Sequence, residues 1–146
     1  MSAIEQQLEQ AAALCERRGA RLTDLRRQVL GLVLEAGRPV GAYDLLDMLR
    51  GRRRGAAPPT VYRALDFLLE HGLVHKVERL SAFVGCPAHD HDHAAQFLIC
   101  SGCGSVTELE NAPVRRALAA VARDHGFTIH GMTVEAEGLC ATCTAA

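Results

Sequence analysis

The chain has 146 residues, of which 49% are hydrophobic, and its formal net charge is −1. This composition can bury a core, and the near-neutral charge argues against a crudely polybasic nucleic-acid binder. No apolar run is long enough to cross a bilayer, and residues 1–10 lack the pattern of a signal peptide. We therefore expect a cytoplasmic protein with no membrane partner.

Charge is divided unevenly along the chain. Residues 1–80 carry 13 basic and 10 acidic side chains, whereas residues 81–146 carry 3 basic and 7 acidic ones. A basic half and an acidic half indicate two regions with different tasks. The six cysteines favour metal binding over disulfides, because the cytosol keeps thiols reduced.

The first half of the chain has apolar residues at helical spacing. Thr23 is the expected N-cap of the second helix, Gly37 its end, and the Pro58-Pro59 pair the start of the fourth. We expect helices at about 4–15, 24–36, 42–50 and 58–70, and a solvated, arginine-rich loop at 51–57. Cys15 lies on the apolar stripe of the first helix and is expected to be a buried hydrophobe.

The apolar pattern changes after the fourth helix. Short β-like runs at 73–78 and 82–86 predict a hairpin. Helices followed by a two-stranded hairpin form a winged helix, so residues 1–86 are expected to be a winged-helix DNA-binding domain. The polar stretch 87–93 is the expected hinge.

Residues 94–146 are expected to form a separate α/β domain, which makes the whole chain an α+β protein. Strands are predicted at 96–99, 105–109 and 127–135, with a helix at 112–125 before the last strand. A region of about 50 residues needs added cross-links for stability.

Two C-x-x-C pairs, Cys100 with Cys103 and Cys140 with Cys143, supply such a cross-link. Four thiolates form a closed tetrahedral cage that suits zinc and leaves no open position for catalysis. Such a site contributes about 10–16 kcal/mol, against a whole-domain stability of about 5–15 kcal/mol. We expect this zinc to be structural and not the sensor. A redox role is the alternative, and the missing βαβ context disfavours it.

A second group of metal-binding side chains surrounds the hinge. A tetrahedral set of His75, Cys86, His93 and Glu108 would join hairpin, hinge and second domain through one ion. A thiolate beside imidazoles favours zinc over iron or manganese. The alternative is that the His-Asp-His-Asp-His run at 89–93 is only a solvated, weakly metal-binding loop.

The helix at 58–70 carries Arg63 on the face opposite its apolar stripe, near its N-terminal end. An arginine there can pair bidentately with guanine in the major groove. Thr60 and Tyr62 are candidate phosphate donors. Tyr43 is either a DNA contact or a partly buried ring. An ordinary amphipathic helix with a charged face is the structural alternative.

Four segments resemble the ferric uptake regulator family, and within it the zinc uptake regulator branch: PPTVYRALDFLLE (58–70), GLVHKVE (72–78), AYDLLD (42–47) and EAEGLCATC (135–143). The similarity covers almost the whole chain. It implies a homodimer, joined by its C-terminal α/β domains, that binds pseudo-palindromic operator DNA and represses zinc-uptake genes when loaded with zinc. It implies structural zinc at Cys100, Cys103, Cys140 and Cys143, regulatory zinc at His75, Cys86, His93 and Glu108, and DNA contacts at Tyr43 and Arg63.

The resemblance also allows a third zinc site, built from His89 and His91 with His125 or His130. Burial is the alternative explanation for His125, which lies near the apolar face of its predicted helix. We expect two zinc ions per chain, or three if this site forms.

Three other functions compete with the repressor hypothesis. A zinc hydrolase with Glu110 as base would need an open metal position, which a four-ligand site does not offer, so we expect no enzyme. A regulator that senses iron, manganese or peroxide is disfavoured by Cys86. A metal-buffering protein would bind no DNA selectively.

Overall fold

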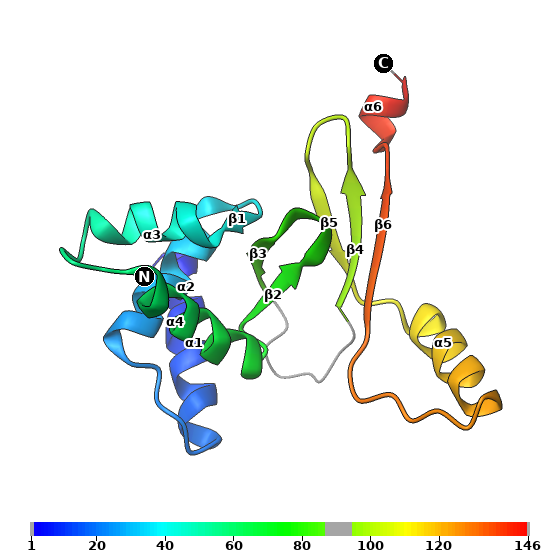
Figure 1. Cartoon of the computed structure of the whole chain (residues 1–146), viewed down its shortest axis with the longest axis horizontal. Helices are drawn as coiled ribbons and strands as arrows, with labels where there is room; N and C mark the ends of the chain where they lie inside the picture. Colours follow the sequence, from blue (N-terminus) through cyan, green and yellow to red (C-terminus); the bar gives the residue numbers. More distant parts are fainter. Residues whose placement is uncertain (1, 87–94, 146) are drawn as a thin grey trace. The chain divides into compact units, whose positions relative to one another are not determined.

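Residues 2–86 and 95–145 are described by the computed structural model (Figure 1). The chain divides into two units, Met1–His91 and Asp92–Ala146, and each is described by itself below. The expected domains, 1–86 and 94–146, remain predictions. The expected hinge at 87–93 lies outside the described residues.

Two capped helices open the first unit. In α1 (Ala3–Arg17) the Ser2 hydroxyl accepts the Glu5 N–H while the Glu5 carboxylate accepts the Ser2 N–H, which forms a capping box. The second helix, α2 (Asp24–Ala36), is capped by the Thr23 hydroxyl and ends at Gly37 with φ of 61°. Both ends of α2 therefore lie where the sequence predicts them.

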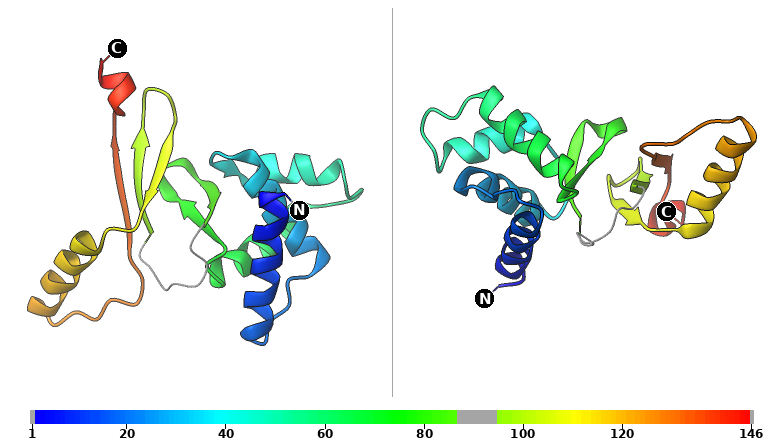
Figure 2. Two further views of the ribbon diagram at one scale, coloured as in Figure 1. Left: turned by 180° about the vertical axis from the view of Figure 1, so that it is seen from behind. Right: turned by 90° about the horizontal axis from the view of Figure 1, so that it is seen from below.

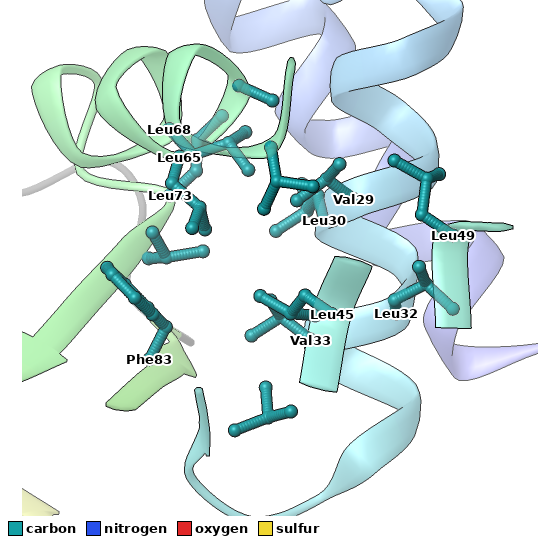
Figure 3. Packing of buried hydrophobic residues seen from close by; sticks show 14 of the residues in the cluster. Val29, Leu30, Leu32, Val33, Leu45, Leu49, Leu65, Leu68, Leu73 and Phe83 are labelled. Carbon is teal, nitrogen blue, oxygen red and sulfur yellow. The ribbon is translucent and has the colours of Figure 1, made fainter. Parts of the chain in front are cut away.

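Two further helices, α3 (Ala42–Arg50) and α4 (Pro58–Glu70), complete the helical part. The four helices enclose one apolar core, which Figure 3 shows from close by. Its fully buried side chains include Val29, Leu30, Leu45, Leu49, Leu65, Leu68 and Leu73. Cys15 belongs to this core, and burial raises the pKa of its thiol. The predicted role of Cys15 as a buried hydrophobe is confirmed.

A three-stranded antiparallel sheet follows the helices. The order is β1-β3-β2, with bounds Val40–Gly41, Ala82–Gly85 and Val74–Val77. The turn between β2 and β3 is a short 3-10 helix, Glu78–Leu80, after which Ser81 has φ of 47°. The four helices followed by the β2–β3 hairpin confirm the predicted winged-helix fold. The two-residue strand β1 is too short to show an alternating pattern, and the sequence did not predict it.

The second unit holds a sheet of order β5-β4-β6, with bounds Val106–Leu109, Ala95–Cys100 and Thr133–Gly138. Strands β4 and β5 are antiparallel, whereas β4 and β6 are parallel. A parallel pair needs a long crossover connection. Here α5 (Ala112–Asp124) and the irregular residues 127–132 provide it, as Figure 2 shows. A short helix, α6 (Ala141–Ala145), follows β6.

One strand prediction is wrong in its bounds. The sequence predicts a strand over 127–135, but β6 starts at Thr133, opposite Ala95. Residues 127–132 have an irregular backbone. They form part of the crossover instead. In the described part of the chain, no helix is both long and apolar enough to cross a membrane.

Candidate metal centre and nucleic-acid interface

The four cysteines of the two C-x-x-C pairs come together at one end of the sheet. Cys100 ends β4, Cys103 lies in the turn after it, and Cys140 and Cys143 lie before and within α6. Their four sulfurs all lie within 4.8 Å of one another. The sulfurs of Cys103 and Cys140 are 3.9 Å apart. Zinc–sulfur bonds of about 2.3 Å in a tetrahedron give sulfur pairs about 3.8 Å apart, so the cluster fits a zinc ion.

The backbone around the cluster is shaped for thiolates. The N–H groups of Cys140 and Cys103 donate to the Cys100 sulfur over 3.3 and 3.5 Å. These hydrogen bonds lower the pKa of Cys100 to about 6. A Cβ atom at Gly102 would lie 3.0 Å from the Cys143 sulfur, so any larger residue would have to push this sulfur aside by a few tenths of an ångström.

The four thiols also affect one another's ionisation. Hydrogen bonds that the Cys143 thiol shares with Cys140, Cys100 and Cys103 favour its protonated form and raise its pKa to about 12. Four neighbouring thiols therefore do not all ionise by themselves. A bound dication removes this conflict, because it stabilises all four thiolates together.

The wing of the first unit brings two further metal-binding side chains together. His75 lies on β2, opposite Val84, and Cys86 directly follows β3, where its N–H donates to the Leu73 carbonyl. The donor atoms of His75 and Cys86 lie within 4.8 Å of each other. Cys86 is buried and His75 is half-buried. The hairpin therefore forms a two-ligand pair.

Two further ligands, Glu108 and His93, are predicted for this site. Glu108 is a half-buried residue of β5 in the second unit, opposite Phe97 of β4. His93 lies outside the described residues, as do His89 and His91.

His125 and His130 line one groove of about 600 Å³ in the second unit. Among the described residues they belong to no cluster of three metal-binding side chains. Both are exposed, so burial within this chain is wrong as an explanation for His125. The third zinc site stays a prediction.

The exposed face of α4 carries the residues predicted to read DNA. Arg63 is exposed and Tyr62 is 44% exposed, whereas Thr60 is half-buried. Leu65 and Leu68 occupy the opposite, core-facing side of the helix (Figure 3). Tyr43, in the first turn of α3, is 68% exposed, so its interpretation as a partly buried ring is wrong. All four side chains have enough exposure to meet a ligand.

The second unit has an exposed apolar face on α5. Val114, Leu118 and Val121 recur at helical spacing on α5, yet each is at least 41% exposed, and Phe127 is 65% exposed. Of the residues of α5, only Ala122 is buried. An apolar patch of this kind marks an interaction surface. The small size of the domain was the signal that could have revealed it, because so short a chain cannot cover both the helix and the sheet.

A model of the ferric uptake regulator family matches residues 17–137. The chain belongs to the ferric uptake regulator family. It is 44% identical, over 137 residues, to the zinc uptake regulation protein of Escherichia coli (strain K12), a match that covers 93% of this chain and 80% of that relative. A regulation protein is not an enzyme, so this relative gives the zinc hydrolase hypothesis no support.

Solved structures of the family are similar as well. A zinc uptake regulator complexed with zinc and DNA matches with a TM-score of 0.94 and 42% identity, over 99% of this chain and 97% of that one. The holo form of XcZur matches with a TM-score of 0.87 at 47% identity, over 95% and 97% of the two chains. Its apo form matches with a TM-score of 0.55 at 46% identity, over 97% of each chain. The holo and apo forms of XcZur therefore differ in shape from each other.

Proposed function

We propose that this chain is a zinc-responsive transcriptional repressor of the cytoplasm, which binds operator DNA as a zinc-loaded homodimer and represses zinc-uptake genes. The observation that carries this proposal is the match, over 99% of the chain, to a zinc uptake regulator bound to zinc and DNA. The metal-binding and DNA-facing side chains described above give the proposal its chemistry.

The first zinc is structural. Cys100, Cys103, Cys140 and Cys143 would hold it, and their four thiolates leave no coordination position for a substrate or water. The zinc supplies a permanent cross-link between the turn after β4 and the start of α6. Without this zinc, the second unit would lose the free energy of metal binding that a domain of this size needs to stay folded.

The second zinc is regulatory. His75 and Cys86 of the wing would bind it, with His93 and Glu108 as the other two ligands. The close pair of donor atoms in the wing supports this assignment, as does the softness of a thiolate, which favours zinc over iron or manganese. The two differing forms of XcZur, holo and apo, support a metal-dependent change of shape in this family.

The DNA interface is α4 together with the start of α3. Arg63 would pair with guanine in the major groove, while Tyr43, Thr60 and Tyr62 contact the strand beside it. The apolar face of α5 would join two chains, and a two-fold dimer calls for a pseudo-palindromic operator.

Zinc would act by increasing the fraction of dimers that are in the DNA-binding form. A near-complete switch requires the DNA-binding form to bind zinc about 10⁴-fold more tightly, or about 5.5 kcal/mol. Because binding free energies are linked, operator DNA would tighten regulatory zinc by the same factor as zinc tightens DNA.

The test measures bound zinc per chain across a buffered range of free zinc, for wild type and Cys86→Ser. Two classes of zinc are expected, one tight and one labile, and only the labile class weakens in the variant. Cys15→Ala is the matched control, because it removes a buried thiol that, among residues 2–86 and 95–145, belongs to no cluster of three metal-binding side chains. A single tight class, equal in all three proteins, would refute the sensor.

A further inference from the structure

Three consecutive arginines, Arg52–Arg54, lie on the connection between α3 and α4 (Figure 1). The predicted solvated loop is confirmed, because residues 51–55 are exposed and form turns and bends without helix or strand. The N–H groups of Arg52 and Arg53 both donate to the Leu49 carbonyl, over 2.9 and 2.7 Å. Ala56 is buried at the end of the turn. The arginine side chains therefore project from a fixed backbone.

The α2 helix orients two of the three guanidinium groups. Arg52 Nη2 lies 3.3 Å from the Glu35 carboxylate, and Arg53 Nε donates to the Gln28 side chain. Arg54 makes no side-chain hydrogen bond or ion pair within the described part of the chain. A guanidinium has five donor hydrogens, so one contact to α2 leaves Arg52 and Arg53 able to bind a further acceptor. The turn thus presents three exposed cations and no acid of its own.

The position of the turn points to a phosphate backbone. It leads directly into α4, whose 13 residues span about 20 Å. This length exceeds the width of the major groove, about 12 Å, so the segments at the ends of the helix face the sugar-phosphate strands.

The N-terminal end of α4 has few hydrogen-bond donors for a phosphate. Pro58 and Pro59 have no N–H, and the N-cap residue Ala57 has no side-chain acceptor or donor. Backbone donors therefore cannot hold a phosphate in the first two positions of α4. The preceding arginines can, because a guanidinium binds phosphate bidentately.

We propose that Arg54, together with the preceding Arg52 and Arg53, binds the phosphate backbone of DNA next to the N-terminal end of α4. The proposal rests on the proposed function and deepens it. These contacts raise affinity and its dependence on salt, and they select no base, because phosphates carry no direct sequence information.

The experiment measures affinity against salt concentration for the zinc-loaded full-length protein. The probe is a duplex that zinc-loaded wild type enriches from a random-sequence pool. A plot of log K against log salt falls with a negative slope, and each lost phosphate contact makes this slope shallower by about 0.9. Arg54→Gln removes one contact from each chain, so the slope of the dimer becomes shallower by about 1.8. Between about 50 and 200 mM salt, the fold-loss of affinity in Arg54→Gln is then roughly 12 times smaller than the fold-loss in wild type.

Two variants serve as controls. Arg54→Lys keeps the cation and is expected to keep the slope, because an ammonium still neutralises a phosphate as a point charge. Arg123→Gln removes the same charge from the exposed surface of α5 in the second unit and is expected to leave the slope unchanged.

The outcomes separate this proposal from the function on which it rests. A wild-type slope in Arg54→Gln overturns the phosphate contact, while zinc-dependent enrichment of a duplex by wild type leaves the repressor function standing. A changed base preference in Arg54→Gln also overturns it, because Arg54 would then read a base. If wild type enriches no duplex in the presence of zinc, the repressor function fails and the phosphate contact with it.

Discussion

The backbone N–H of Cys140 donates a hydrogen bond of 3.3 Å to the sulfur of Cys100, across 40 residues of chain. One C-x-x-C pair therefore supports the thiolate of the other. The two pairs act as one site, in which the first pair depends on the backbone of the second.

Replacing a single cysteine should accordingly disable the whole cluster. We expect Cys100→Ser to lose the tight zinc, to unfold the second unit and to abolish the dimer, because the metal supplies about 10–16 kcal/mol. Metal analysis measures the zinc, circular dichroism the unfolding and analytical ultracentrifugation the dimer. Cys15→Ala, in the other unit, should keep the zinc and the dimer. A Cys100→Ser protein that retains tight zinc would contradict the assignment.

Acid should release the structural zinc only at low pH. The pKa of Cys100 is lowered from about 9 to about 6, so the stability that this thiolate contributes is complete above about pH 9 and is lost as the pH falls from there through about 6. Because protons compete with the ion for the ligand sulfurs, we expect zinc to be retained at pH 7 and to be lost below about pH 6, where the Cys100 sulfur is protonated as well. Equilibrium dialysis followed by metal analysis checks this, and zinc loss already complete at pH 7 would be inconsistent with it.

The apolar face of α5 should decide whether the protein dimerises. Val121→Glu places a charge on that face and should weaken dimerisation by at least tenfold, because an unpaired buried charge is costly. Sedimentation across a range of concentrations gives the dissociation constant. Arg116→Glu lies on the opposite side of α5 and should leave the dimer intact. Equal dissociation constants for the two variants would rule out this face as the interface.

Arg63 should set base preference. We expect Arg63→Ala to lose about 1–3 kcal/mol of discrimination at one base pair, because a bidentate contact to guanine disappears. Binding to duplexes that carry each base at every position of the operator measures this loss. Glu70→Ala, at the far end of α4, is the control. Unchanged preference in Arg63→Ala would assign base reading to another element.

The helical half of the fold could be predicted because its signals are local. Thr23 and Gly37 mark the ends of α2, and Pro58 marks the start of α4, where the structure has them. Each signal acts within one turn of helix, so it does not depend on distant residues.

The second unit was predicted less well, because the bounds of its strands and the burial of its helix depend on residues far away in the sequence or in another chain. Strand β6 pairs with β4, which lies 38 residues earlier in the chain, and no local pattern encodes this pairing. The spacing of Val114, Leu118 and Val121 predicts a helix with one apolar face, but it does not show whether the surface that covers this face belongs to the same chain. The four cysteines were the exception, since C-x-x-C spacing defines a metal site by itself.

The pairing of Cys100 with Cys140 has a further consequence for how the protein is made. During synthesis, β4 and the first C-x-x-C leave the ribosome long before the second pair exists. The second unit can then close only after residue 143 has emerged and an ion has been captured. Under the proposed function, a newly made chain therefore needs zinc before it can assemble, so zinc supply would limit how much mature repressor a cell holds as well as how active that repressor is.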